Sequence, residues 1–148
     1  MILVPEDFIV PTSLKEEKFR LEPLTGSHNE EDYAAWQSSI EHIHATPGFS
    51  GKEWPMKELP LETNLEELNE HHDDFKSRKG FTYTVLSTST GKVIGCVYLY
   101  EAKREGYDVD LKSWVSADYA ELDKSLHEAV LSWLKTEWPF KSVDYATR

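Results

Sequence analysis

The fold class is indicated most clearly by residues 81–115, which read FTYTVLSTSTGKVIGCVYLYEAKREGYDVDLKSWV. This stretch contains three segments with strand composition, at 81–86, 93–100 and 107–115, separated by short polar turns. The middle segment is almost entirely apolar, which is typical of a central strand that is covered on both faces. Gly91 lies in the turn between the first two segments and indicates a hairpin there. We therefore expect an antiparallel meander of three strands.

Strand and helix patterns flank this stretch on both sides. Before it we expect a strand at 19–22, a helix that begins at the S-x-x-E capping box of 27–30, and a second helix that begins at the T-x-x-E box of 63–66. After it, a helix with an apolar stripe over 122–134 leads to a last strand at 142–147. A helix that connects two strands usually makes them parallel neighbours. The fold class is therefore α+β: a mainly antiparallel sheet flanked by helices, with a helix crossover to the last strand. The apolar face of the second helix is expected to carry Leu61, Leu65, Leu68, His72 and Phe75.

The length of 148 residues fits a single domain preceded by an arm. Two prolines favour an extended arm at 1–18, with a short edge strand around Phe8–Val10, and the domain spans 19–148. Cys96 is the only cysteine, which makes an internal disulfide impossible and suits a reducing compartment. The first residues lack the basic segment of a signal peptide, and no apolar run reaches the roughly 20 residues that span a bilayer. We expect a cytoplasmic location.

The charge balance disfavours some partners. The chain has 27 acidic and 16 basic residues and a net charge of −11. Nucleic acid and an anionic membrane surface are therefore not expected as partners. Residues 1–74 hold 17 acidic and 5 basic side chains, so the acidity belongs to the N-terminal half. This half is either a solvating face or a negative field that attracts a cationic amine, a guanidine or a basic peptide.

Three stretches resemble the GNAT superfamily, the GCN5-related N-acetyltransferases. They are FRLEPL at 19–24, YTVL with GKVIGCVY at 83–98, and WVSADY at 114–119 with the helix that follows. The resemblance covers about residues 19–148. It implies transfer of an acetyl group from acetyl-CoA to a small-molecule amine or a basic peptide. The pantetheine arm would lie along the strand backbone, and the pyrophosphate would lie at the start of the following helix. The cofactor-binding residues that it implies are Trp114, Val115, Ser116, Lys124 and Ser125.

The phosphate-binding turn departs from the family pattern. Where the family has Gln/Arg-x-x-Gly-x-Gly/Ala, residues 120–125 read AELDKS and contain no glycine. Glycines allow a close backbone approach and a helix start favours anions, but Asp118, Glu121 and Asp123 crowd this start with negative charge. We expect the usual phosphate contact to be weak or absent, with Lys124 as the nearby cation that could compensate.

The chain also stops before the further helix and strands with which the family commonly continues. The last strand would then be an exposed edge, which the arm at Phe8–Val10 or a second subunit in a homodimer could cover. Two functions are open at this point. One is a CoA-dependent N-acetyltransferase with an atypical cofactor site. The other is a non-catalytic GNAT-fold binding module that has lost acetyl-CoA binding.

Acetyl transfer implies a general base for the amine, and three carboxylates are candidates. Asp108 and Asp110 alternate on the third strand of the meander, and Glu101 ends the strand before it. The alternative is that Asp108 and Asp110 share a solvated face with Lys112.

Two other features have alternative interpretations. Glu67, His71 and Asp74 share a face of the second helix, but such spacing is common on solvated helices and no metal site is expected. Trp54, in the loop after the first helix, either packs in the core or shapes an acceptor pocket.

Overall fold

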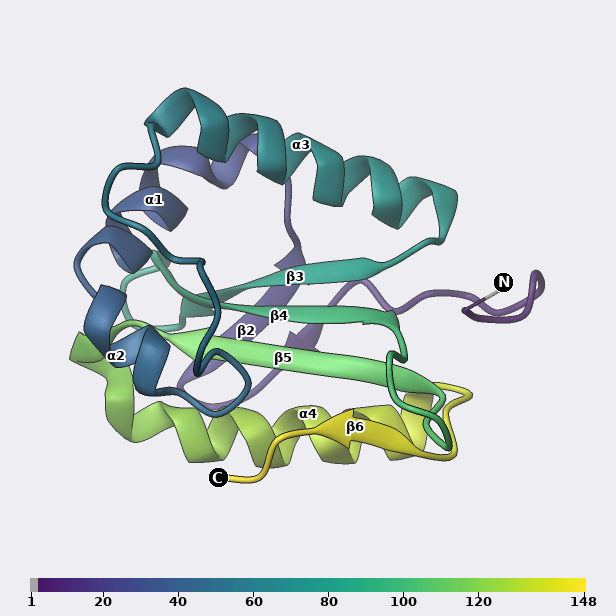
Figure 1. The fold of residues 1–148 in the computed structure, drawn as a ribbon. Coiled ribbons are helices and arrows are strands. Elements are labelled where there is room, and N and C mark those ends of the chain that lie inside the picture. The colour runs from purple at the N-terminus through teal and green to yellow at the C-terminus, as the bar shows by residue number, and fades with distance from the viewer. Residues whose placement is uncertain (1–2) are drawn as a thin grey trace.

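The meander forms the centre of the sheet in the computed structural model, which describes residues 3–148 (Figure 1). β3 (Phe81–Ser87), β4 (Val93–Glu101) and β5 (Val109–Val115) pair antiparallel in sequence order. Gly91, in the turn between β3 and β4, has a φ of 75°, in the left-handed region that favours glycine. The predicted three-strand meander is confirmed.

Three further strands extend the sheet, whose order is β1-β2-β3-β4-β5-β6. β1 (Leu14–Lys15) and β2 (Phe19–Pro23) continue the antiparallel pairing beside β3. β6 (Val143–Tyr145) pairs parallel with β5 after a helical crossover. The predicted α+β class with a parallel last strand is confirmed.

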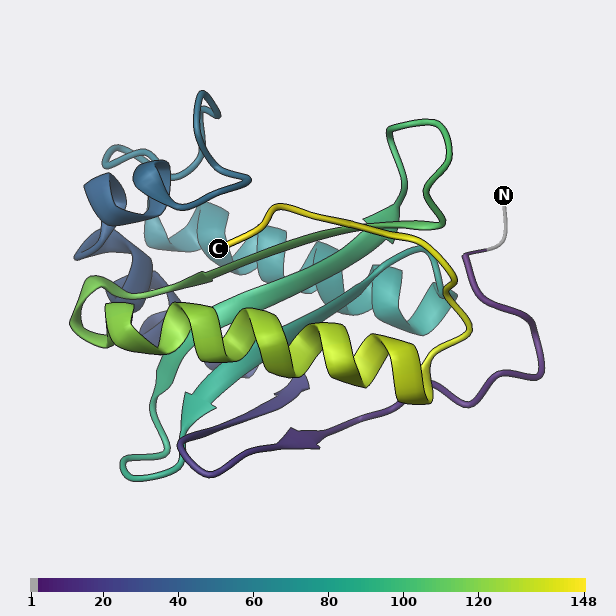
Figure 2. The same ribbon diagram turned by 90° about the horizontal axis from the view of Figure 1, so that it is seen from below.

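Helices cover both faces of this sheet (Figure 1). α1 (Asn29–Gln37), α2 (Ile40–Ala45) and α3 (Leu61–Ser77) lie on one face. α4 (Asp123–Glu137) lies on the other face, and in Figure 2 it lies in front of the sheet and runs from left to right. Along residues 3–148, no helix has the length and the apolar character needed to cross a bilayer.

Each face of the sheet has its own apolar core because side chains alternate along a strand. On β5, Leu111 and Val115 pack in the core under α4, whereas Trp114 packs with Trp36 and Ile43 in the core under α1 and α2. This alternation gives the second face a concentration of aromatic rings, and the pocket described below opens among them.

The N-terminal arm lies elsewhere than the sequence predicts. Its strand is at Leu14–Lys15 and not at Phe8–Val10, and it pairs with β2, at the edge of the sheet opposite β6. The arm therefore does not cover β6. It is held by side chains instead: Phe8 packs 5.4 Å from Trp138, between ring centroids, and the Tyr83 hydroxyl donates to the Pro11 carbonyl at 2.6 Å.

Both predicted capping boxes are wrong. The first helix follows a 3-10 turn at Gly26–His28, and the capping box is formed by Thr25 and His28. The His28 ring nitrogen Nδ1 accepts the Thr25 backbone N–H at 3.0 Å, which is the role that the sequence pattern gave to Glu30. The second helix begins after Pro60, with no side-chain cap. Proline fits there because its fixed φ suits the residue that leads into a helix.

The inner face of α3 matches the prediction in part, because Leu68 is buried and Phe75 packs with its ring centroid 5.2 Å from that of Phe81. Leu61 and Leu65 are 37% and 39% exposed. The face turned toward the sheet carries Asn64 and Leu68, which are buried, and the partly buried His71. Asn64 and His71 have hydrogen-bond partners inside the protein. Because these bonds satisfy their polar atoms, the two residues can lie on a buried face where an apolar pattern would predict leucine.

Candidate ligand pocket and the start of helix α4

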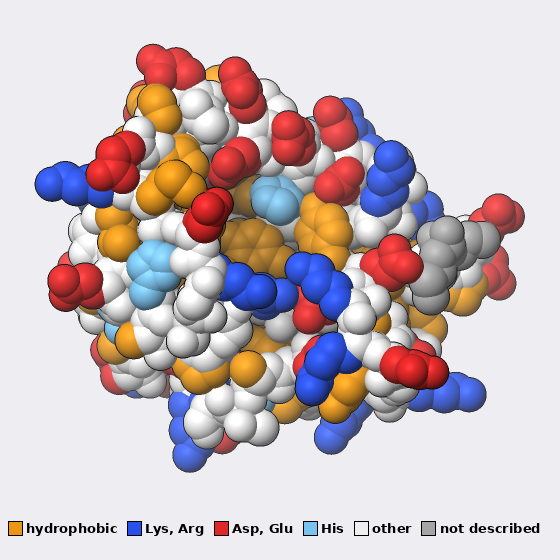
Figure 3. Space-filling model, in the orientation of Figure 1, with side chains coloured by type: hydrophobic (Ala, Val, Ile, Leu, Met, Phe, Trp, Pro, Cys, Tyr) orange, Lys and Arg blue, Asp and Glu red, His pale blue; other side chains and the backbone are white. Residues whose placement is uncertain are grey.

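A pocket of about 500 Å³ opens between α3, the loop 46–60 and strands β4 and β5. It is the hollow near the centre of Figure 3, with hydrophobic side chains at its floor and basic side chains along one edge. This volume is within the range of small-molecule sites.

Aromatic rings form much of the pocket wall. Phe49, Trp54 and Tyr98 line it, with ring centroids 5.8 Å apart for Phe49 and Trp54 and 6.4 Å for Phe49 and Tyr98. Trp54 also packs against Trp36 and Trp114, with ring centroids 5.6 and 5.9 Å away. Both interpretations of Trp54 therefore hold: it packs against the core, and it shapes a pocket.

A buried carboxyl group lies at the floor of the pocket. Asp32, on α1, is 4% exposed, and its Oδ2 accepts a hydrogen bond from the Asn64 side-chain amide at 3.1 Å. Asn64 also donates to Asn29 Oδ1 at 2.8 Å and accepts from Trp36 Nε1 at 3.1 Å, which fixes its orientation between α1 and α3. Burial raises the pKa of Asp32 to about 6. Within residues 3–148, no cationic side chain forms an ion pair with this carboxyl.

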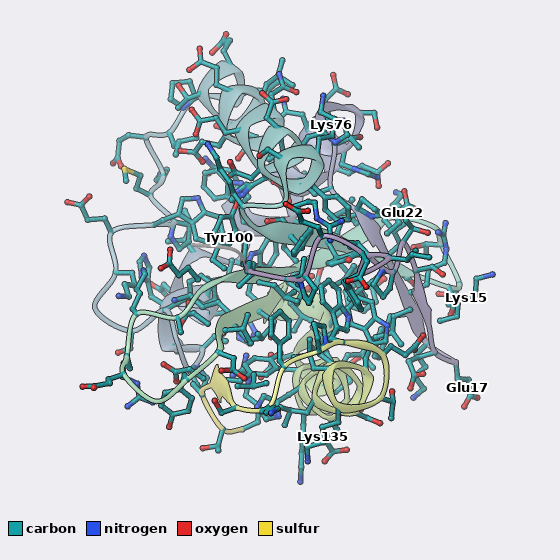
Figure 4. The ribbon with its side chains drawn as sticks, turned by 90° about the vertical axis from the view of Figure 1, so that its right-hand side faces the viewer. Lys15, Glu17, Glu22, Lys76, Tyr100 and Lys135 are labelled. Carbon is teal, nitrogen blue, oxygen red and sulfur yellow. The ribbon has the colours of Figure 1, made fainter. Side chains whose placement is uncertain are left out.

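A hydrogen-bonded chain fixes a histidine on the pocket wall. The Tyr100 hydroxyl donates to Asp74 Oδ2 at 2.8 Å, and its oxygen lies 2.8 Å from His71 Nδ1. Tyr100 lies between the sheet and α3 (Figure 4), and a Cβ at Gly80 would collide with its ring. Thr82 Oγ1 also lies 3.2 Å from His71 Nδ1. With the Tyr100 proton on Asp74, a proton on Nδ1 would satisfy the Tyr100 oxygen, and this tautomer would leave Nε2 as an acceptor. Burial lowers the pKa of His71, which favours this neutral form.

The three predicted general bases lie in different places. Asp110 lines the pocket and pairs with Lys112 at 2.7 Å. Asp108 is exposed and accepts the backbone N–H groups of Lys141 and Ser142 at 2.7 and 3.2 Å, and these bonds lower its pKa. Glu101 is exposed at the end of β4. The structure thus brings one of the three to the pocket.

Sequence reasoning missed Asp32 and Asn64, and it placed His71 on a helix face with Glu67 and Asp74 without assigning it to a pocket. Asp32 precedes Trp36 by one helical turn, and Asn64, Leu68 and His71 follow one another at helical spacings of four and three. A polar residue on the apolar face of a helix is the signal that could have identified Asp32, Asn64 and His71. The face shared by Glu67, His71 and Asp74 is present, but the described residues contain no group of three or more His, Cys, Asp or Glu side chains placed to hold a metal ion.

The predicted cofactor residues lie at the end of β5 and the start of α4. Trp114, Val115 and Ser116 are buried, and Lys124 and Ser125 are exposed in the first turn of α4. The backbone around Ser116 is already paired, because its N–H donates to the Ile94 carbonyl at 2.8 Å and the next N–H, of Ala117, donates to Ser39 Oγ at 2.8 Å.

These residues do not fit a pyrophosphate group. Asp123 is the first residue of α4, and its Oδ2 accepts a hydrogen bond from Arg148 Nε at 2.6 Å. The Arg148 guanidinium also donates to the backbone carbonyl of Ser113 on β5 at 2.9 Å. A phosphate at this helix start would meet a carboxylate that already has its own counterion. No glycine lies in the turn to permit a closer backbone approach.

Comparison with known proteins identifies the fold. No protein-family profile matches the sequence, and no curated protein matches it in sequence. Solved structures do match. A ribosomal-protein-S5-alanine acetyltransferase from Vibrio fischeri has a TM-score of 0.64 at 15% identity, over 84% of this chain and 67% of that one. A GCN5-related N-acetyltransferase from Brucella melitensis has a TM-score of 0.63 at 16% identity, over 85% and 56%. A microcin C7 self-immunity acetyltransferase, solved with acetyl-CoA and AMP, has a TM-score of 0.60 at 13% identity, over 85% and 66%.

The chain therefore has the GNAT fold, as its sequence resemblance implied. It spans 56% to 67% of the length of these three structures.

Proposed function

We propose that this GNAT-fold chain binds a small organic amine in the pocket between α3, the loop 46–60 and β4–β5. The observation that carries the proposal is the Asp32 carboxyl: it is buried at the floor of an aromatic-walled pocket and has no cationic partner within residues 3–148. A buried charge is stable only when it is paired, so a ligand ammonium would supply the missing partner.

The aromatic walls suit the same ligand. Trp54, Tyr98 and Phe49 surround the space, and the faces of such rings attract cations by about 0.5–2 kcal/mol each, most strongly where water is excluded. A ligand with an apolar body and an ammonium end would therefore be favoured over either part alone. This combination is found in small alkyl and aryl amines.

His71 gives the pocket a second polar contact. Its Nε2 is the unprotonated ring nitrogen when Nδ1 is bonded to Tyr100, and His71 lines the same space as Asp32. An ammonium group has three N–H donors, so it can donate to Asp32 and to His71 together. The pair would fix the amine in orientation as well as in place.

The pocket lining carries charges of both signs, because Glu67 and Asp110 line it together with three lysines. The lysines are Lys52, Lys103 and Lys112, and Lys52 and Lys103 are exposed. Lys112 is paired with Asp110, which leaves Lys52 and Lys103 to repel a strongly basic peptide. They favour a ligand with one ammonium group and an otherwise neutral or anionic structure. Of the two acceptors that the sequence indicates, a small-molecule amine and a basic peptide, we therefore propose the small-molecule amine.

Calorimetric titration with matched ligands tests the proposal. Tyramine and its neutral analogue 4-ethylphenol share an aromatic body and differ in the ammonium group. We expect the amine to bind at least about tenfold more tightly, and Asp32→Asn to remove most of this preference. The control is Glu30→Gln, which removes an exposed carboxylate from the same helix. Equal affinity for both ligands, or an unchanged preference in Asp32→Asn, would contradict the proposal.

Acetyl transfer to the bound amine is a second candidate function. The observation that favours it is the fold shared with an acetyltransferase that was solved with acetyl-CoA and AMP. The fold alone does not establish activity. Release of free thiol from acetyl-CoA that depends on both the protein and the amine would support this function, and its absence with an amine shown to bind would argue against it.

A further inference from the structure

A buried arginine lies between the end of β5 and the start of α4. The Arg148 side chain is 5% exposed. Its Nε donates to Asp123 Oδ2 at 2.6 Å, Nη2 donates to the Ser113 carbonyl at 2.9 Å, and Nη1 donates to the Ala146 carbonyl at 2.8 Å. The guanidinium also lies 5.5 Å from the centre of the Tyr145 ring. Most of its donors are therefore used inside the protein.

The partner of this arginine is the first residue of the helix. At a helix start the free N–H groups and the macrodipole favour a negative charge, and Asp123 supplies that charge from the chain itself. Asp123 Oδ1 and His127 Nε2, one helical turn further on, are buried and have no hydrogen-bond partner within residues 3–148. The start of α4 is thus a polar, largely enclosed cluster that already contains an anion and its counterion.

We propose that the Asp123–Arg148 pair takes the place of a bound phosphate at the start of α4 and closes this end of β5 to acetyl-CoA. A pyrophosphate group placed there would have to displace the Asp123 carboxylate from Arg148 and from the helix start. It would also lie near Asp118 and Glu121, which are exposed in the preceding 3-10 turn, Ala117–Leu122. Both effects oppose a polyanion.

The pair predicts a gain of binding when its anion is removed. Asp123→Asn keeps the size of the side chain and leaves Arg148 and the helix start without a negative partner. We expect this variant to bind inorganic pyrophosphate at least about tenfold more tightly than the wild type, because the anion can then form the charged hydrogen bonds that Asp123 forms in the wild type. Adding Arg148→Gln should return the affinity to the wild-type level. The matched control is Asp118→Asn, which makes the same change of charge away from Arg148.

Calorimetric titration at low ionic strength is the test, with pyrophosphate and acetyl-CoA as probes. We expect no binding of acetyl-CoA to the wild type at concentrations up to about 1 mM. One-to-one binding of acetyl-CoA by the wild type would overturn the proposal, and so would an unchanged pyrophosphate affinity in Asp123→Asn. If that variant does not fold, the wild-type titration decides: binding refutes the proposal and a flat trace supports it. The outcomes leave amine binding untouched, because it is tested by other ligands and by another aspartate. They do separate the two proposed functions: binding of acetyl-CoA by the wild type would support acetyl transfer, and a flat trace would argue against it.

Discussion

Replacing Asp32 by asparagine is expected to stabilise the free protein at neutral and alkaline pH. The ordinary pKa of an aspartate is 3.8, and burial raises the pKa of Asp32 to about 6. At about 1.4 kcal/mol per pH unit, the charged form of this residue lowers the free energy of unfolding by about 3 kcal/mol well above pH 6. Asparagine has nearly the same shape, stays neutral, and its carbonyl oxygen can still accept the hydrogen bond from Asn64.

The pH dependence distinguishes this effect from a simple change of packing. Between pH 3.8 and about 6 the folded protein retains the Asp32 proton while the unfolded chain releases it. The folded state therefore binds more protons, and this residue makes stability fall as pH rises through that range. The stability difference between Asp32→Asn and the wild type should be smallest below pH 3.8 and grow by about 3 kcal/mol up to about pH 7.

Urea unfolding at a series of pH values measures this difference directly. Glu30→Gln is the control, because Glu30 is exposed in the first turn of the same helix and its replacement should change stability by no more than about 1 kcal/mol. A difference between Asp32→Asn and the wild type that stays constant with pH would refute the assignment of a buried, unneutralised carboxyl. A stability difference that falls as pH rises would refute the same assignment.

Three further outcomes are expected. Trp54→Leu should weaken amine binding about 3- to 30-fold in calorimetric titration, whereas Tyr107→Leu, which changes an exposed ring outside the pocket lining, should leave it unchanged. Amine affinity in the wild type should fall as pH drops below about 6, approaching about tenfold per pH unit, because protonated Asp32 carries no charge. A pH-independent affinity would argue against contact with this group. Asn64→Ala should lower the free energy of unfolding by about 2–4 kcal/mol in urea, because it leaves the buried Trp36 N–H and the Asp32 carboxyl without partners.

The sheet could be predicted from the sequence because its signals are local. Alternation on β5 separates Trp114 from Leu111 and Val115, and the glycine turn sets the hairpin of β3 and β4. The prediction of the two capping boxes failed although their signals are also local. Several side chains can accept a backbone N–H at a helix start, and here the His28 ring does so where the pattern favours glutamate.

The pocket could be predicted only in part, because its parts come from distant segments. Asp32 and Asn64 lie 32 residues apart, on two helices whose contact no local pattern specifies. The tautomer of His71 depends on its contact with Tyr100, which lies 29 residues further along the chain on β4. Strand alternation identified Asp110 as a site residue because it places this side chain on an accessible face. It placed Asp108 on the same face, whereas in the structure Asp108 accepts backbone N–H groups just before β6.

The lengths of the two outer strands have a consequence for association between copies of the chain. A sheet edge can act as a template for a strand from another molecule, since its unpaired N–H and C=O groups are ready to bond. Here the sheet begins with a strand of two residues and ends with one of three. Each outer strand offers few hydrogen bonds to an incoming strand, although β6 pairs only with residues 109–111 of β5 and leaves residues 112–115 without a strand on that side within residues 3–148. Outer strands this short are poor templates for fibrillar stacking of copies of the chain.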